Sequence, residues 1–99
     1  MWINAGKTSD IDEGKSQVLN VNGKEIALFK IEGKLFAIEN ICPHRGGPLA
    51  EGFLEGSEVT CPWHAWTFDV KTGMCHTVPD TKQPTFKVKI ENNEVFVEV

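Results

Sequence analysis

Four side chains suited to metal binding fall in two short segments of this 99-residue chain. They are Cys42, His44, Cys61 and His64, in the pattern C-x-H-x16-C-x2-H. Thiolate and neutral imidazole are ligands for borderline and softer metals, so a pair of each, similarly arranged in each segment, predicts one shared metal site. The fold must therefore bring two distant loops together.

The single residue between Cys42 and His44 narrows the kind of site. Ligand pairs of structural zinc sites are usually separated by two or more residues, because both must bend back onto one ion. If the centre is binuclear, each loop can give its Cys to one iron and its His to the other. A zinc-bound interaction module stays the alternative from another class, and a colourless protein with stoichiometric zinc would identify it.

The arrangement resembles the Rieske [2Fe–2S] proteins, in which two His replace two Cys on one iron. The resemblance covers most of the chain, because the turn at 68–73 and the closing hairpin follow the family's usual order. It implies one [2Fe–2S] cluster per chain, held by Cys42 and Cys61 on the buried iron and by His44 and His64 on the outer iron.

This resemblance implies an electron carrier rather than an enzyme. Two Fe³⁺, two S²⁻, two thiolates and two neutral imidazoles sum to zero charge, and one added electron gives −1. We expect a stand-alone ferredoxin between a reductase and a terminal oxidoreductase, either an oxygenase or a nitrite reductase. The alternative is the small subunit of an NADH-dependent nitrite reductase. The oxygenase component itself is excluded, because its non-haem iron needs two further His and a carboxylate, and only His76 remains.

The same resemblance predicts a low reduction potential. High-potential Rieske proteins of cytochrome bc complexes carry a disulfide between the ligand loops and hydroxyl donors from a Ser and a Tyr. Aligned on the ligands, this chain has Gly47 and Trp63 at the Cys positions, and Trp66 and Phe68 at the hydroxyl positions. Without these donors the reduced cluster is less stabilised, so we expect a potential near the bottom of the family's range, about −150 mV.

Short β-type segments separated by turn residues predict an all-β fold. The resemblance implies the Rieske arrangement, an antiparallel sandwich or barrel-like base with an inserted two-loop cluster-binding subdomain. No segment shows a helical period. The expected strands span residues 17–21, 25–31, 34–39, 58–61, 65–70, 86–90 and 95–99. Turns are expected at Asn22-Gly23, Glu32-Gly33 and Asn92-Asn93, and irregular stretches at 40–56 and 77–84.

Length and charge set the remaining expectations. We expect a single domain over 1–99, with its cluster-binding part at about 40–80. Residues 39–69 hold five acidic residues and one basic residue, whereas the rest of the chain is neutral. Such an acidic segment disfavours nucleic acid and anionic membranes, and it either steers a basic partner or only aids solubility. No apolar run is long enough for a signal peptide or membrane span, so we expect a cytoplasmic monomer with Cys75 outside any disulfide.

Overall fold

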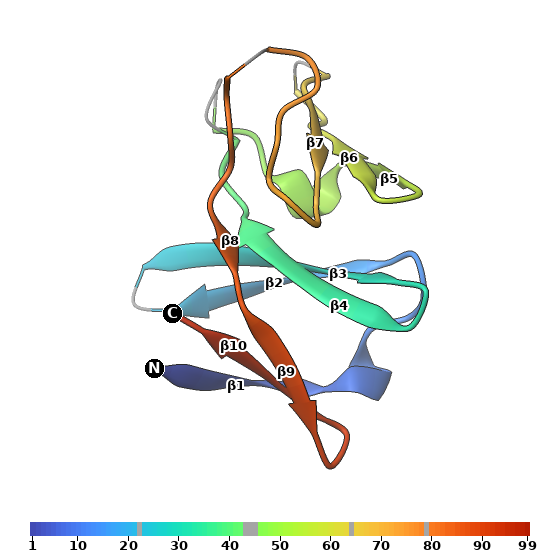
Figure 1. The fold of residues 1–99 in the computed structure, drawn as a ribbon, viewed down its shortest axis with the longest axis vertical. Coiled ribbons are helices and arrows are strands. Elements are labelled where there is room, and N and C mark those ends of the chain that lie inside the picture. Colours follow the sequence, from blue (N-terminus) through green and yellow to red (C-terminus); the bar gives the residue numbers. More distant parts are fainter. Residues whose placement is uncertain (22, 43–45, 64, 79) are drawn as a thin grey trace.

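The computed structural model describes residues 1–99 except 22, 43–45, 64 and 79 (Figure 1). Antiparallel strands make up nearly all of its regular structure, which confirms the predicted all-β fold. The elements are β1 (Trp2–Lys7), β2 (Ser16–Val21), β3 (Lys24–Ile31), β4 (Lys34–Glu39), β5 (Phe53–Glu55), β6 (Glu58–Thr60), β7 (Thr67–Asp69), β8 (Thr85–Phe86), β9 (Val88–Glu91), β10 (Glu94–Glu98), and the 3₁₀ turns η1 (Thr8–Asp10) and η2 (Leu49–Glu51).

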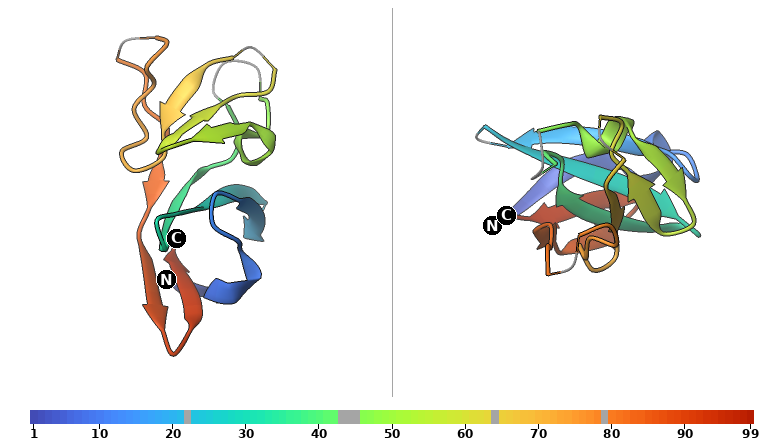
Figure 2. Two further views of the ribbon diagram at one scale, coloured as in Figure 1. Left: turned by 90° about the vertical axis from the view of Figure 1, so that its right-hand side faces the viewer. Right: turned by 90° about the horizontal axis from the view of Figure 1, so that it is seen from above.

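The strands form three sheets. Their orders are β1-β10-β9, β2-β3-β4-β8 and β5-β6-β7. We call the first two sheets the base and the third the small sheet. The small sheet lies at one end of the molecule, beyond the base, in Figure 1 and in the left view of Figure 2. In the sequence it is inserted between β4 and β8, as an inserted subdomain requires.

The sheet that contains β3 and β4 is the middle layer of the structure. Successive residues of β3 enter different cores: Ala27 and Phe29 pack toward the small sheet, while Ile26 and Leu28 pack toward β10. All four are at most 1% exposed. A strand buried on both faces reads as a continuous apolar run rather than an alternating one, which is the pattern of residues 26–29.

Tight turns fix the register of the base. The hairpin between β3 and β4 turns at Glu32 and Gly33, and the one between β9 and β10 turns at Asn92 and Asn93. All four residues have positive φ, as a two-residue turn of the primed type requires. Both predicted turns are therefore confirmed. Asn22 of the third predicted turn lies outside the described residues.

Several predicted boundaries were wrong. No strand was expected at β1 or at β5, which lies inside the stretch predicted to be irregular. The strand expected at 65–70 forms only over Thr67–Asp69, and the one expected at 86–90 is divided at Lys87. The division lets β8 pair with β4 and β9 pair with β10, so the chain passes from one sheet to the other. On β9 the side chain of Ile90 is 45% exposed.

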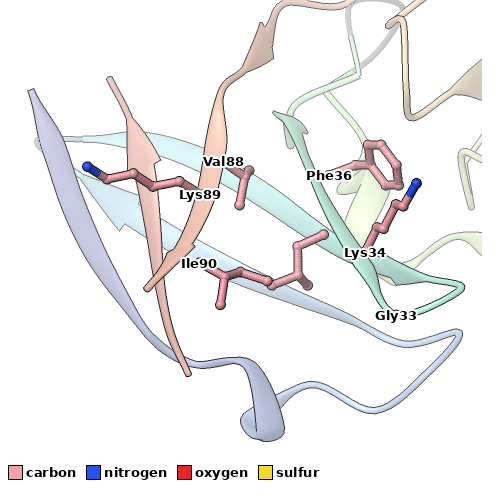
Figure 3. Close-up of a pocket in the computed structure, with 7 residues that line it drawn as sticks. Gly33, Lys34, Phe36, Val88, Lys89 and Ile90 are labelled. Carbon is pink, nitrogen blue, oxygen red and sulfur yellow. The ribbon is translucent and has the colours of Figure 1, made fainter. Parts of the chain in front are cut away.

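A pocket of about 290 Å³ lies in the base where β4 and β9 diverge. Figure 3 shows the side chains of Val88 and Ile90 from β9 near those of β4, with Lys89 reaching away toward β1. The lining residues are Gly33, Lys34, Leu35, Phe36, Val88, Lys89 and Ile90. None of them belongs to the two predicted ligand loops, so this pocket is not the predicted metal site.

Candidate metal centre

Each predicted cysteine ligand lies within three residues of the end of a strand. Cys42 comes shortly after β4 and Cys61 immediately after β6. Both are 2% exposed and belong to the core between the middle layer and the small sheet. Predicted ligands His44 and His64 lie outside the described residues. The structure thus places both thiols at the same end of the molecule and in one core.

The two cysteine loops repeat one backbone hydrogen-bond pattern. The Cys42 carbonyl accepts from the N–H of Gly46 at 2.8 Å, and the Cys42 N–H donates to the carbonyl of Gly47 at 2.9 Å. The Cys61 carbonyl accepts from the N–H of Ala65 at 3.1 Å, and its N–H donates to the carbonyl of Trp66 at 2.8 Å. Both loops therefore have the same length, counted from the cysteine to the residue that closes the loop.

The residue four positions after each cysteine has a left-handed backbone. Gly46 has φ +76° and Ala65 has φ +59°. Glycine adopts this conformation without steric cost, whereas a residue with a Cβ is strained by about 1–2 kcal/mol. The second loop keeps this conformation although it lacks the glycine. The loop shape is therefore imposed by its closing hydrogen bonds and surroundings rather than by the local sequence alone.

Gly47 brings the two loops into direct contact. A Cβ built on Gly47 would lie 2.7 Å from the Sγ of Cys61 and 3.3 Å from the Cβ of Trp63. A side chain at position 47 would therefore enter the space beside the Cys61 sulfur. Two buried thiols, on matched loops that touch at a glycine, fit a metal centre shared between the loops. The contact also places positions 47 and 63 side by side, as the alignment on the ligands predicts.

The aromatic residues near the loops differ in burial. Phe68 is fully buried in the core that contains both cysteines, and Trp66 packs against that core as a partly buried side chain. These two residues occupy the positions predicted to lack hydroxyl donors, and their apolar side chains limit water near the thiols. Trp63, by contrast, is 58% exposed.

Two buried polar residues beside the first loop were missed from the sequence. Asn40 and Gln83 are each 1% exposed. The Asn40 side chain donates from Nδ2 to the Glu25 carboxylate at 3.0 Å and accepts from the N–H of Ala50 at 2.8 Å. Both residues lie in segments that read as irregular, where a polar residue is ordinarily exposed. No sequence signal distinguished them.

The remaining Cys and His residues take no part in the predicted ligand set. All three cysteines are described and none forms a disulfide, as expected for Cys75. Cys75 is 5% exposed, and its Sγ accepts from the N–H of Val78 at 3.4 Å. His76 is a surface residue whose Nδ1 lies 2.6 Å from the Glu58 carboxylate. Among the described residues no group of three or more His, Cys, Asp or Glu is arranged to hold a metal.

A row of carboxylates crosses the outer face of the small sheet. Glu55, Glu58 and Asp69 are direct register partners on β5, β6 and β7. Like charges opposite one another on neighbouring strands are destabilising. Among the described residues, Glu58 alone of the three has an imidazole beside it, that of His76. We call these three residues the acidic row. Phe53, on the same strand as Glu55, is 75% exposed beside it.

Comparison with known proteins identifies the family to which these features belong. The family model described as "Rieske [2Fe-2S] domain" matches residues 1–93. The ferredoxin component of the naphthalene 1,2-dioxygenase/salicylate 5-hydroxylase systems of Ralstonia sp. is 46% identical over 99 residues, which cover 99% of this chain and 95% of that protein.

Solved structures agree on the fold. A complex of reduced oxygenase and oxidised ferredoxin in carbazole 1,9a-dioxygenase contains a chain that matches with TM-score 0.91 and 31% identity, covering 97% of this chain and 91% of that one. A nitrite reductase small subunit from Mycobacterium tuberculosis also matches with TM-score 0.91, over 100% of this chain and 96% of that one. Its identity is 20%, so it supports the fold alone. Over the described residues, no helix is long and apolar enough to span a membrane.

Proposed function

The chain belongs to the Rieske [2Fe–2S] domain family, and on that basis we propose that it is a one-electron carrier that delivers electrons to a terminal oxygenase. It is a ferredoxin component and not itself a catalyst. The [2Fe–2S] cluster of the family supplies the redox couple when bound. We propose the electron donor to be a reductase, and the substrate of the oxygenase to be aromatic, as the names of the relatives suggest.

The observation that carries this proposal is the pair of matched cysteine loops that meet at Gly47. We propose Cys42 and Cys61 as the ligands of one iron, because both are buried in one core. We propose His44 and His64 as the ligands of the other iron. The buried thiolates would then hold the end of the cluster inside the apolar core. The imidazoles would hold the end that a redox partner can approach.

The chain's own residues keep the thiol side dry. Phe68 and Leu49 are fully buried in the core around both cysteines. An apolar shell excludes water and lowers the effective dielectric, which disfavours the more negative reduced form and so keeps the potential low. This agrees with the expected potential of about −150 mV for a carrier supplied by a reductase.

We also propose the organisation of the chain and its state in the cell. The base and the small sheet form a single domain, and the segment from about 40 to 80 is its cluster-binding part. The protein acts as a monomer in the cytoplasm. A single domain is supported by the core shared between the middle layer and the small sheet, to which Phe29 and Val59 both contribute.

Docking to the oxygenase would use the end that carries the loops. The acidic row and the exposed ring of Phe53 lie on the small sheet, which suits a partner surface with basic residues around an apolar centre. Electrostatic steering raises association rates and is screened by salt. Electron transfer to the oxygenase should therefore slow as salt is added.

The test is stopped-flow mixing of the reduced protein with oxidised oxygenase across a salt series. We expect the second-order rate to fall with salt and to fall again in Glu55→Gln. Glu94→Gln is the matched control, because it removes the same charge from the base at β10. A rate that is independent of salt, with both variants equal to the wild type, would contradict steering by the acidic row and indicate that the row only aids solubility. Absence of any electron transfer would reject the proposed function.

A further inference from the structure

Gln83 is a fully buried polar residue directly behind the first cysteine loop. Its Nε2 donates to the carbonyl of Glu39 at 2.7 Å and to the carbonyl of Ile41 at 2.6 Å. A side-chain amide has two N–H donors, so Gln83 uses both of them on the backbone that leads into the loop. Glutamine is ordinarily exposed at the surface. Burial of its amide is tolerated where the amide makes hydrogen bonds inside the protein.

The bond to Ile41 fixes the peptide group that leads into Cys42. The oxygen of this peptide group is held by Gln83 at 2.6 Å, and its N–H, which belongs to Cys42, donates to the carbonyl of Gly47 at 2.9 Å. Hydrogen bonds in series polarise and strengthen one another. The peptide is therefore held at both ends, and its plane sets the direction in which the Cys42 side chain leaves the backbone.

The effect extends to the second loop through Gly47. Gly47 accepts the Cys42 N–H and lies against the sulfur of Cys61. A shift of the Ile41–Cys42 peptide would move the Gly47 carbonyl and with it the contact to Cys61. One side chain thus restrains the position of both sulfur ligands through the backbone of the first loop.

Gln83 is itself held by a third segment. Its backbone N–H donates to the carbonyl of Gly73 at 2.7 Å, and Pro84 accepts the N–H of Glu39 at 2.9 Å. β8 begins only at Thr85, which pairs with Ile38. The Gln83 side chain therefore continues the contact between β4 and β8 beyond the last ladder pair, and it ties the loop to the segment around Gly73.

We propose that Gln83 is a positioning residue of the metal centre, which holds the Ile41–Cys42 peptide so that both cysteine sulfurs are prearranged for the cluster. The inference rests on the ligand set proposed above. It assigns to Gln83 an effect on the cluster that is separate from its contribution to the stability of the fold. Partners behind metal ligands typically change metal affinity by roughly 10- to 100-fold when they are removed.

The test compares Gln83→Met with Val97→Ala in the cluster-loaded protein. Methionine keeps the length and much of the volume of glutamine but donates no hydrogen bond. Val97 is fully buried in the other core, between the middle layer and the β1-β10-β9 sheet, so Val97→Ala destabilises the fold away from the loops. The readouts are the thermal midpoint of the loaded protein, the rate at which visible absorbance is lost to a chelator, and the EPR spectrum of the reduced form.

We expect Gln83→Met to release the cluster roughly 10- to 100-fold faster than the wild type and to shift the EPR g values. Val97→Ala should change the midpoint but neither cluster readout. Wild-type release and an unshifted spectrum in Gln83→Met would overturn the inference, as would equally fast release from Val97→Ala. If Gln83→Met does not fold, the shorter amide of Gln83→Asn is compared in the same way. A wild type that binds no [2Fe–2S] cluster would instead reject the ligand set.

Discussion

Gly47→Ala tests whether the two cysteine loops form one metal centre. The added Cβ would lie 2.7 Å from the Cys61 Sγ, whereas ordinary contact begins near 3.4 Å, so the sulfur or the loop must move by roughly 0.7 Å. Metal–ligand distances tolerate only about 0.2 Å. We therefore expect cluster affinity to fall by at least the roughly 10- to 100-fold seen when a supporting partner is lost.

The cost to the fold should be smaller than the cost to the centre. Overpacking of this kind costs about 1–3 kcal/mol of unfolding free energy. Gly46→Ala is the matched control. Its φ is +76°, so it is strained by about 1–2 kcal/mol, but among the described residues its added Cβ would meet only the Ile41 Cγ2, at 3.9 Å.

The assay is iron and sulfide content with visible absorbance after reconstitution, beside urea unfolding of the apo forms. We expect both variants to lose similar stability and only Gly47→Ala to lose the cluster. A Gly47→Ala protein with wild-type absorbance and a wild-type rate of cluster release would refute the argument that Gly47 makes room for the sulfur.

Four further outcomes are expected. Cys42→Ser should abolish the visible absorbance and lower the thermal midpoint of the isolated protein, because cluster binding is coupled to folding; an intact spectrum would reject the ligand. Phe68→Tyr should raise the potential above about −150 mV if the hydroxyl reaches a sulfur, as voltammetry would measure, and a wild-type midpoint well above zero would contradict the low-potential assignment. Ala65→Gly should stabilise the apo protein by about 0.5–1 kcal/mol in urea unfolding, because relief of about 1–2 kcal/mol exceeds the entropy cost of about 0.4–1 kcal/mol; a loss of stability would argue against strain at this residue. Hydrogen bonds from the backbone N–H groups of Gly33 and Glu32 lower the pKa of Glu13. The stabilisation of the folded state that follows is present above the unfolded-state pKa and is lost as pH falls through the folded-state pKa. Urea unfolding should therefore find Glu13→Gln less stable than the wild type at pH 7 and equal to it in acid.

The fold could be predicted where local chemistry and burial agree. Alternating apolar and polar residues predicted β10. Glycine and asparagine predicted the turns at Glu32-Gly33 and Asn92-Asn93, where the structure has positive φ. The short strand β5 could not be predicted, because its pairing partner β6 supplies the order that its own sequence lacks. Glycine and proline residues around it predict a loop when only local sequence is considered.

The metal centre shows the same division. Residue type and spacing singled out Cys42 and Cys61, since few patterns place thiolate and imidazole so close together. The contact of Gly47 with the Cys61 sulfur joins residues 14 apart in the chain, and the two hydrogen bonds of Gln83 join residues 44 and 42 apart. Such support is a property of the tertiary structure, and one sequence alone contains no periodicity or motif that reveals it.

The pairing of β1 with β10 has a consequence for how this module can be built into larger assemblies. The N-terminal ammonium of Met1 donates to the main-chain oxygen of Val99 at 3.0 Å, and the Val99 N–H donates to the carbonyl of Met1 at 2.9 Å. Both ends therefore leave the base side by side, away from the end that carries the small sheet (Figure 1). Adjacent ends are what allows one domain to be inserted into a loop of another. A tether attached at either end, or a host protein joined at both, would leave the face beside the cysteine loops open to a redox partner.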